Sequence, residues 1–425
     1  MNTTVEEFLN DLRWRGLIYQ VTNEELLIES LNNGSKVYCG VDPTASSLHI
    51  GHIVPFITMK RFINAGHSGI VLLGGATGTI GDPSGRSSER NLLSFSEVIN
   101  NSNSLKLQLE HLLGDNRSIE HVNNIDWFGN LSVIDFLRDY GKLINVNYML
   151  NKESVSSRLD NGLSFTEFSY TLIQGLDFKH LNENYGVDIQ IGGSDQWGNI
   201  TTGLEMIRKT NDESKALGLT IPLIKKSDGT KFGKSAGGSV WLDKNLTSVY
   251  DFYQFWFNTN DDDVIKYLKI FTLLTKDEIE TIECQFNEDR GLRYAQKILA
   301  EQMTIFVHGE EELVNVLNQK DLMINGNLLN LTEGSFLNML NNLEIKNVDC
   351  LINKKLVNLL VASGVIESNR RAREDILNGA IKVNGNKILD SNYEISDSDF
   401  LFSNLNYIFI EKGKKIKKIL HLNGF

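Results

Sequence analysis

The sequence predicts an α/β fold: a parallel sheet with helices on both faces comes first, an α-helical domain follows, and a small α+β domain comes last. Two continuous apolar runs, Lys36–Val41 and Ser68–Leu73, are typical of buried strands. An amphipathic helical pattern lies between them and is closed by Gly66. Strands that are apolar throughout and separated by helices indicate a parallel sheet covered on both faces.

The length of the chain favours several domains. With 425 residues it exceeds an average domain, which has roughly 100–200 residues. We expect the sheet domain over residues 1–225, a helical domain over 226–325, and the small domain over 350–425. Residues 320–350 are rich in Asn and weakly patterned, so we expect a connector there.

Further elements can be placed along the first two domains. Residues 187–191 are predicted to form another strand, followed by Gly192-Gly193-Ser194. In parallel sheets ligands bind beyond the carboxyl ends of the strands, where such glycine-rich loops occur. Residues 249–257 and 263–268 have helical patterns, with Thr247-Ser248 and Asp261-Asp262 as predicted N-terminal caps.

The last 75 residues are predicted to form a compact module of two helices and a hairpin. The first helix covers residues 351–365, and Ser368 caps a second helix that carries three arginines. A strand at Ile381–Val383 then leads into Asn384-Gly385, which is a strong signal for a type I′ hairpin turn. Five lysines lie between positions 412 and 418.

Charge is distributed unevenly along the chain. Its formal net charge is −12, but residues 351–425 hold 12 Lys and Arg against 8 Asp and Glu, so this region carries +4 and the first 350 residues carry −16. A basic module on an acidic body suggests that one module binds a polyanion such as the phosphate backbone of RNA. A solvated lysine tail is the alternative, and the arginine-bearing helix favours RNA.

Composition also bears on the cellular setting. No apolar run approaches the roughly 20 residues that span a bilayer, and the acidic N-terminal segment lacks the apolar core of a secretory signal. Cys39, Cys284 and Cys350 lie far apart and form no Cys-x-x-Cys pair. This pattern argues against a disulfide scaffold and a structural zinc site, and we expect a cytoplasmic protein.

Two common nucleotide-binding motifs are not matched. No Gly-x-Gly-x-x-Gly follows the first strand, which disfavours a dinucleotide fold. The segment from Gly229 to Ser235 has three residues between its glycines, where a P-loop requires four. The segment from Gly81 to Ser87 fails in the same way and lacks the lysine.

A histidine pair lies where an anion site is expected. His49 and His52 are three residues apart, so on a helix they share one face. A structural role is the commoner outcome for such a pair, and no third ligand has metal-binding spacing. The pair nevertheless opens a helix just after a buried strand, where backbone N–H groups favour anions and disfavour imidazolium. We therefore expect neutral imidazole donors to phosphate oxygens.

At these residues the sequence resembles a known family. His49-Ile50-Gly51-His52 and Lys231-Phe232-Gly233-Lys234-Ser235 look like the two signature motifs of class I aminoacyl-tRNA synthetases. The second departs from the commonest Lys-Met-Ser-Lys-Ser form in its two middle residues. Further stretches resemble bacterial tyrosyl-tRNA synthetases, and they begin at Tyr38, Gly81, Tyr170 and Gly192. The last module resembles the RNA-binding domain shared with ribosomal protein S-four.

The resemblance implies a Rossmann-like catalytic domain and a role for each matching residue. The catalytic residues would be Thr44, His49, His52, Arg86, Arg90, Lys231, Lys234 and Ser235. Tyrosine would be held by Tyr38, Asp82, Tyr170, Gln174, Asp177 and Gln196. ATP would contact Cys39, Gly40, Asp42, His49, Gly51, His52, Gly193, Asp195 and Lys234. RNA would be bound by Arg370, Arg371, Arg373, Lys412, Lys414 and Lys415.

The implied reaction explains these residue types. Tyrosine and ATP would give tyrosyl-adenylate and pyrophosphate, and the tyrosyl group would then pass to the 3′ end of its tRNA. The attacking carboxylate is already ionised, so catalysis needs positioning and charge stabilisation rather than a general base. Mg²⁺ would accompany ATP, which is a substrate, and the protein would need no metal site of its own. The resemblance also implies a homodimer, with an inserted segment of residues 1–225 at the dimer interface. No membrane partner is expected, because no apolar run is long enough to span a bilayer.

Three other functions are alternatives to a tyrosyl-tRNA synthetase. A tryptophanyl enzyme would share the fold and both motifs, but Tyr38 and Asp177 favour a phenol over an indole. A non-catalytic RNA-binding relative would not need intact His and Lys motifs. A small-molecule adenylyltransferase could use a His-x-Gly-His loop, but it would not need the basic module.

Overall fold

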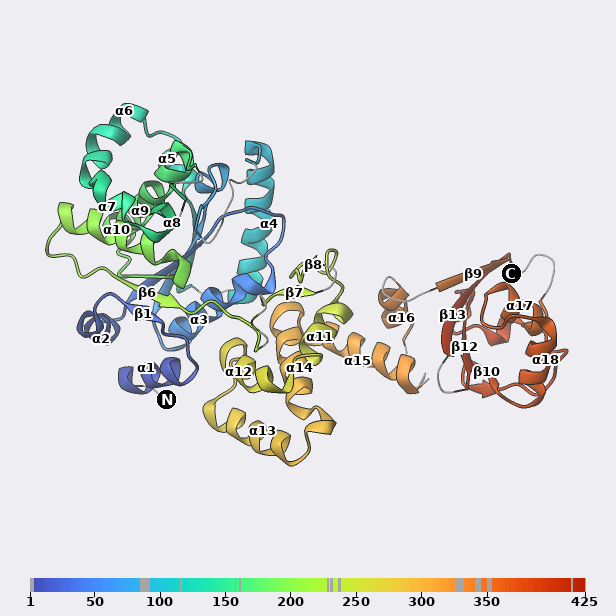
Figure 1. Cartoon of the computed structure of the whole chain (residues 1–425). Coiled ribbons are helices and arrows are strands. Elements are labelled where there is room, and N and C mark those ends of the chain that lie inside the picture. The colour runs from blue at the N-terminus through green and yellow to red at the C-terminus, as the bar shows by residue number, and fades with distance from the viewer. Residues whose placement is uncertain are drawn as a thin grey trace. The chain divides into compact units, whose positions relative to one another are not determined.

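The computed structural model of the chain (Figure 1) describes most of its residues. They are residues 4–84, 92–114, 117–156, 158–159, 162–227, 229, 232–235, 238–325, 332–340, 345–349, 354–413 and 416–424. The chain divides into two compact units, one made of Met1–Thr247 with Gln254–Val307 and the other of Ser248–Tyr253 with His308–Phe425.

The first unit is built on a six-stranded sheet with the order β1-β6-β5-β2-β3-β4 (Figure 1). Its strands are β1 (Gln20–Val21), β2 (Lys36–Val41), β3 (Ser68–Leu73), β4 (Ile119–Asn123), β5 (Ile189–Gly193) and β6 (Leu217–Ile221). Neighbouring strands are parallel, except that β1 pairs antiparallel with β6 at one edge. The predicted parallel sheet is confirmed, and β2 and β3 have the predicted bounds. The strand expected at residues 187–191 is β5, which begins two residues later.

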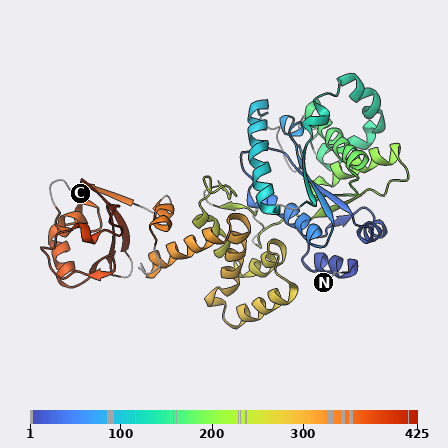
Figure 2. The same ribbon diagram turned by 180° about the vertical axis from the view of Figure 1, so that it is seen from behind.

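Helices cover both faces of this sheet (Figures 1 and 2). The principal ones are α1 (Val5–Trp14), α2 (Glu24–Asn32), α3 (Ile53–Asn64), α4 (Phe95–Leu113), α9 (Phe165–Tyr185) and α10 (Trp197–Thr210). Successive residues of β3 point to opposite faces, as in any strand. Gly69 lies against Met59 and Ile63 of α3, with room for no side chain of its own. The next residue, Ile70, instead packs with Phe178 of α9, so α3 and α9 lie on opposite faces.

A group of short helices lies between β4 and α9. They are α5 (Ile125–Phe128), α6 (Val133–Asp135), α7 (Val146–Leu150) and α8 (Glu153–Ser156), with irregular turns between α6 and α7. We call residues 125–156 the insertion. Several of its large apolar side chains are exposed.

The helical pattern predicted after residue 247 is confirmed. The helices are α11 (Val249–Phe257), α12 (Asp261–Phe271), α13 (Lys276–Glu288), α14 (Tyr294–His308) and α15 (Glu310–Asn325). Ser248 caps the first helix as predicted, because its Oγ accepts from the backbone N–H of Asp251 at 3.1 Å. The cap predicted at Asp261-Asp262 was wrong: the capping position is Asn260, and the aspartates occupy the first turn. Their charge is favourable there because it faces the positive end of the helix dipole.

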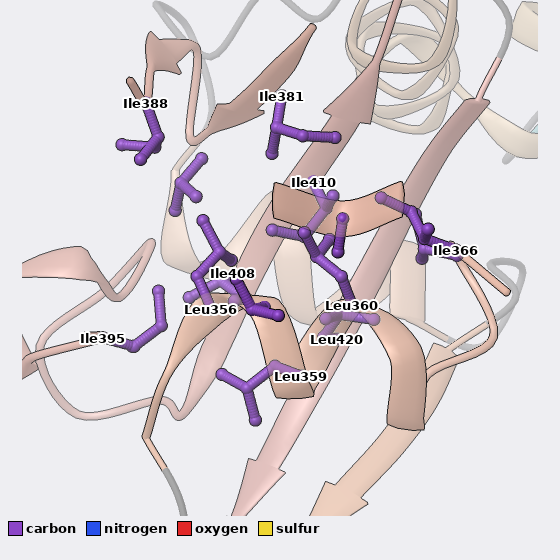
Figure 3. Packing of buried hydrophobic residues seen from close by; sticks show 14 of the residues in the cluster. Leu356, Leu359, Leu360, Ile366, Ile381, Ile388, Ile395, Ile408, Ile410 and Leu420 are labelled. Carbon is purple, nitrogen blue, oxygen red and sulfur yellow. The ribbon is translucent and has the colours of Figure 1, made fainter. Parts of the chain in front are cut away.

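The second unit contains a five-stranded sheet with the order β11-β10-β12-β13-β9. Its strands and helices are α16 (Glu333–Leu340), β9 (Ile345–Asp349), α17 (Leu356–Ala362), α18 (Asn369–Leu377), β10 (Ile381–Val383), β11 (Asn386–Lys387), β12 (Tyr407–Lys412) and β13 (Ile416–Asn423). The predicted Asn384-Gly385 turn is confirmed, since both residues have positive φ, of 48° and 81°. Figure 3 shows the core of this unit, where Leu356 and Leu360 of α17 pack on Ile408 and Leu420 of the sheet.

One expectation for the second unit was wrong. Residues 320–350 are not simply a connector, because they include α16 and β9, and β9 pairs in parallel with β13. The alternative of a lysine tail does not hold for the described lysines near the end. Lys412 ends β12, and Lys417 and Lys418 lie within β13, which pairs with β12. Ile419 belongs to one apolar cluster and Leu420 to another, so successive residues of β13 are buried on opposite faces of the sheet.

Candidate active site

A cavity of about 510 Å³ opens at the carboxyl end of the sheet in the first unit. Its lining comes from the ends of β2 and β5, from the start of α3, from α9 and from the loop after β3. This is where a parallel sheet is expected to bind ligands. The lining includes these predicted site residues: Tyr38, Cys39, Gly40, Asp42, Thr44, Gly51, His52, Asp82, Tyr170, Gln174, Asp177, Gly193, Asp195 and Gln196.

The most buried carboxylate that lines the cavity is that of Asp177, which is 1% exposed. It accepts from Trp127 Nε1 at 2.9 Å and from Asn124 Nδ2 at 3.1 Å. Burial raises the pKa of Asp177 well above its usual range, and the two donors oppose that effect. The two bonds fix the position of the carboxylate and leave it able to accept a hydrogen bond from a further donor.

Tyr38 complements this carboxylate. Its ring is 1% exposed, and its hydroxyl has no hydrogen-bond partner among the described residues. Burial raises the pKa of the Tyr38 hydroxyl, and the nearby charge of Asp177 raises it further, so the phenol stays protonated. A buried hydroxyl without a hydrogen-bond partner is unfavourable in free energy. A ligand hydroxyl that bonds to it would remove this penalty. One ligand hydroxyl can accept from Tyr38 and donate to Asp177 at the same time.

Nearer the mouth, two carboxylates are arranged to hold a cation. Asp42 accepts from Tyr170 Oη at 2.8 Å and from Thr77 Oγ1 at 2.7 Å. Asp82 accepts from Gln196 Nε2 at 2.8 Å. The pKa of Tyr170 is raised by burial and by both carboxylates, which therefore lie close to its hydroxyl. Tyr170 bonds Asp42, which the resemblance assigned to ATP, so Asp42 also borders the expected ammonium pocket.

An amide network connects the second carboxylate to α9 and α10. Gln196 Oε1 accepts from Gln174 Nε2 at 3.0 Å and from Asn199 Nδ2 at 3.1 Å. Asn199 also donates to Gln174 Oε1 at 2.7 Å. Since every amide is oriented by its neighbours, Gln196 presents its Nε2 to Asp82 in a defined direction. Gln174 and Gln196 are therefore brought together with Asp82, as expected.

The histidine motif opens α3 as predicted. His49 caps a single 3-10 turn, Ile50–His52, that runs directly into α3. The two rings stack with centroids 3.8 Å apart. His49 Nδ1 accepts from the backbone N–H of Gly51 at 3.0 Å, which assigns the proton of a neutral ring to Nε2. His49 is thus suited to donate from Nε2, in agreement with the expected neutral state.

The two signature motifs meet in space although about 180 residues separate them. Gly233 has φ of 88°, and a side chain there would lie 3.6 Å from the backbone nitrogen of Gly51. Val240 connects both segments: its N–H donates to Gly233 O at 3.1 Å, and its carbonyl accepts from Ile50 N–H at 3.0 Å. The segment that carries the lysines is therefore anchored beside the histidines by backbone bonds.

Several predicted residues are not described in full. Arg86, Arg90 and Lys231 lie outside the described residues, as do Lys414 and Lys415. Lys234 and Ser235 form the short strand β7 (Lys234–Ser235), which pairs with β8 (Gly238–Ser239), but their side chains are not described. Among the described residues, no cluster of His, Cys, Asp and Glu has the arrangement of a metal site.

Some site residues were missed by the sequence analysis. Asn124 and Trp127 follow β4, an edge strand that was not predicted, although polar residues after a short strand are a usable signal. Thr77, Asn199 and Gln190 were also missed. Gln190 is 4% exposed, lines the cavity beside Tyr38, and its Oε1 has no partner in the described part of the chain.

The predicted RNA-binding residues of the second unit differ in how they are paired. Arg370 lies 3.2 Å from Glu374, and Arg371 lies 3.5 Å from Asp375, which Lys412 also approaches at 2.9 Å. Within the described residues, Arg373 has no ion-pair partner. Of these four cations it is the one free to bind an anion without first giving up a carboxylate.

Comparison with protein families matches nearly the whole chain. The family described as "tRNA synthetases class I (W and Y)" matches residues 30–322. The family described as "Tyrosine--tRNA ligase SYY-like C-terminal domain" matches residues 341–419. A protein from Macrococcus caseolyticus named tyrosine–tRNA ligase is 50% identical over 410 residues, which are 96% of this chain and 97% of that protein. One of the same name from Staphylococcus saprophyticus is 48% identical over 412 residues, with the same coverage.

Solved structures agree with this result. A C-terminally truncated mitochondrial tyrosyl-tRNA synthetase from Aspergillus nidulans has a TM-score of 0.66 and 33% identity, over 74% of this chain and 94% of that one. A tryptophanyl-tRNA synthetase from Encephalitozoon cuniculi has a TM-score of 0.56 but only 14% identity, over 76% of this chain and 93% of that one. This second likeness concerns the fold alone.

Proposed function

The chain belongs to the class I tRNA synthetases of the tryptophan and tyrosine type, and from this premise we propose that it is a tyrosine–tRNA ligase. The observation that carries the choice of amino acid is the buried pair of Tyr38 and Asp177. Together they offer one donor and one acceptor to a phenol hydroxyl, while Asn124 and Trp127 hold the acceptor in place. An indole has no group that can both donate and accept, so the same pair disfavours tryptophan.

The substrate amino acid is proposed to lie along the cavity. Its phenol would reach Tyr38 and Asp177 at the deep end, and its ammonium group would lie between Asp42, Asp82 and the Tyr170 hydroxyl. Gln174 and Gln196 would support that end through their bonds to Asp82 and to one another. Two carboxylates near one cation supply the charge balance that a buried ammonium requires.

The proposed first step is the attack of the tyrosine carboxylate on the α-phosphorus of ATP. One P–O bond forms, the bond to the β-phosphate oxygen breaks, and the electron pair leaves with pyrophosphate. No proton needs to be removed from the nucleophile, so the protein acts by positioning and by stabilising negative charge. We assign that stabilisation to Thr44, His49, His52, Arg86, Arg90, Lys231, Lys234 and Ser235.

The nucleotide is proposed to occupy the mouth of the cavity above the start of α3. Its contacts would come from Cys39, Gly40, Asp42, Gly51, Gly193 and Asp195, in addition to the two histidines and Lys234. Backbone N–H groups at this helix start favour anionic phosphates. Mg²⁺ is proposed to arrive with ATP as part of the substrate.

Transfer to tRNA assigns roles to the other parts of the chain. We propose that residues 1–225 carry the chemistry, that 226–325 supply the Lys segment and the anticodon-binding helices, and that the last module binds RNA. The proposed RNA contacts are Arg370, Arg371, Arg373, Lys412, Lys414 and Lys415. The cytoplasm is the proposed location. Its reducing conditions suit Cys39 and Cys284, which are both free thiols. Among the described residues, no helix has both the length and the apolar character that a membrane crossing requires.

A test of the RNA assignment compares two neighbouring arginines. Arg373→Ala is expected to weaken binding of tyrosine tRNA several-fold and to lower the salt dependence of binding by about one counterion. Arg370→Ala is the matched control. It should have less effect, because Arg370 must first leave Glu374 before it binds a phosphate. Filter binding over a range of salt concentrations measures both, and an equal loss in the two variants would refute the distinction.

A homodimer is also proposed, and exposed apolar side chains of the insertion support it. Val133 and Ile134 are 72% and 69% exposed, and Val146 at the start of α7 is 62% exposed. Clustered exposure of this size in one chain segment is typical of a surface that a partner covers.

The dimer prediction can be checked by sedimentation. A Val133→Asp/Ile134→Asp variant is expected to be monomeric, since two carboxylates would be buried without partners in the interface. Leu292→Asp is the control, because Leu292 is 74% exposed on a turn between α13 and α14 and should not affect assembly. A dimeric double variant would place the interface elsewhere.

The overall reaction is tested by charging. Purified protein, ATP and tRNA from a related bacterium should give tRNA esterified with radiolabelled tyrosine and not with tryptophan. Charging with tryptophan would favour the other enzyme of the family. Failure to charge either amino acid, with tyrosine binding intact, would favour a non-catalytic relative.

A further inference from the structure

One face of α12 contacts the second signature motif and the segment that precedes it. The face is formed by Asp263, Tyr267 and Phe271, which are four residues apart and therefore lie above one another on the helix. All three are buried. None of them belongs to either signature motif, and none lines the cavity.

The segment before the motif is bonded to the first turn of α12. Asp263 accepts from the backbone N–H of Ser227 with both carboxylate oxygens, at 3.1 Å each, and from Ser227 Oγ at 3.1 Å. Asp263 is 3% exposed, and a buried carboxylate with several donors is an effective anchor. One turn further along the helix, Lys266 Nζ donates to the carbonyl of Lys225 at 3.3 Å, and Lys225 itself lines the cavity.

The motif itself is held by an aromatic socket. The ring of Phe232 stacks on Phe271 with centroids 4.9 Å apart, and it meets Tyr267 edge-on at 5.1 Å. Trp256 of α11 closes the socket at 5.8 Å. Aromatic pairs of this geometry add specific attraction to the burial of the ring. Ser227, which precedes the motif, and Phe232, which lies within it, thus both contact α12.

The opposite end of α12 is fastened to the helix that follows the histidines. Arg61 of α3 donates to the carbonyl of Thr272, just after α12 ends, and is 7% exposed. Arg15, after α1, donates to the carbonyls of Lys269 at 2.9 Å and Leu274 at 2.7 Å. These guanidinium groups satisfy carbonyls that a helix leaves unpaired at its end, and their charge complements the dipole. α12 therefore contacts both the segment of the second motif and α3, the helix that begins directly after His52.

We propose that α12 sets the position of the lysine-bearing motif relative to the histidine motif, and that Asp263 is a positioning residue for adenylate formation. The inference rests on the proposed function, since it assigns α12 a role in that reaction. Asp263 would touch neither substrate. It would act through Ser227, by holding the segment that carries Lys234 at the distance from His49 and His52 that the leaving pyrophosphate requires. A small displacement of positioned groups is enough to slow such a step substantially.

The experiment measures adenylate formation in single turnovers, by the change in tryptophan fluorescence or by trapping labelled adenylate. Asp263→Ala is expected to lower the rate constant about 10-fold, while the dissociation constant for tyrosine changes less than about 2-fold. Asp262→Ala is the matched control, because Asp262 is exposed on the same turn and should leave both values unchanged. Thermal unfolding of each variant accompanies the kinetics.

A double variant separates positioning from general destabilisation. If Asp263 acts through the lysine segment, adding Asp263→Ala to Lys234→Ala should slow the step no further. A full additional 10-fold loss, or an equal weakening of tyrosine binding, would overturn the proposal. If Asp263→Ala does not fold, Asp263→Asn and Ser227→Ala take its place. Asp263→Asn keeps the side-chain volume, and Ser227 lies at an exposed position. The same non-additivity with Lys234→Ala is required of both variants.

The outcome also distinguishes this inference from the proposed function. If Lys234→Ala alone leaves adenylate formation unchanged, the proposed role of the lysine motif fails. If Lys234→Ala slows the step but Asp263→Ala matches the Asp262→Ala control, only the role of α12 fails.

Discussion

Replacing Asp177 with Ala is expected to lower kcat/KM for tyrosine activation by about 10²–10³-fold. The change removes the acceptor for the substrate hydroxyl and also leaves Asn124 and Trp127 as buried donors without a partner. The lost hydrogen bond to the substrate, together with two unsatisfied buried donors, costs about 3–4 kcal/mol. ATP–pyrophosphate exchange at varied tyrosine concentration measures the loss.

Tyr38→Phe is the matched control for this prediction. It removes one neutral hydroxyl and keeps the ring, so the expected loss is about 10-fold. The site geometry predicts this rank order, because loss of the Asp177 carboxylate leaves two buried donors without an acceptor, whereas the Tyr38 hydroxyl has no partner among the described residues. An Asp177→Ala variant as active as Tyr38→Phe would show that the phenol binds elsewhere.

Replacing His49 with Ala is expected to slow adenylate formation by about 10²–10³-fold while tyrosine binding stays within 2-fold. His49 lies at the start of α3, outside the deep end of the cavity, and presents Nε2 as a neutral donor. A donor that acts on the leaving pyrophosphate stabilises the transition state more than the bound substrates. Stopped-flow measurement of the rate constant and equilibrium measurement of the dissociation constant separate the two.

Thr58→Ser in the same helix serves as the control for this variant. The Thr58 hydroxyl bonds the carbonyl of Val54 within α3, and Thr58 does not line the cavity, so the substitution should leave the rate unchanged. An equal loss of rate and of tyrosine affinity in His49→Ala would mean that the ring supports the pocket rather than the reaction.

The parts of the fold that could be predicted from the sequence are those with a strong local signal. The strands β2 and β3 are buried on both faces, so their apolar runs mark their ends to the residue. The turn at Asn384-Gly385 is equally local, because both residues adopt positive φ. The capping residue Ser368 was also predicted, because a helix cap can be recognised from the residues next to it in the sequence.

Elements that depend on distant partners could not be predicted in this way. β1 has two residues, and β4 is an edge strand with no fully buried residue. β9 is recognisable as a strand only through its pairing with β13, about 70 residues later, and its neighbourhood was therefore taken for a connector. The lysines of β13 suggested a tail because its buried Ile and Leu side chains are visible only once the sheet is formed.

The candidate site shows the same division. Residues of the two motifs and of the substrate pocket were predicted from a family resemblance, and the structure brings the described ones together. The residues that hold these groups in position were not predicted. Each of them makes a contact between positions far apart in the sequence, such as Asn124 with Asp177 or Ser227 with Asp263. A single sequence contains no signal for such pairs, although they orient the groups that act.

The central claim is that the chain activates tyrosine, and ATP–pyrophosphate exchange tests it most directly. Purified protein should incorporate labelled pyrophosphate into ATP when tyrosine is added, and should show no exchange with phenylalanine or tryptophan. Exchange that depends on tryptophan, or the absence of exchange with tyrosine in protein that binds both substrates, would contradict the account.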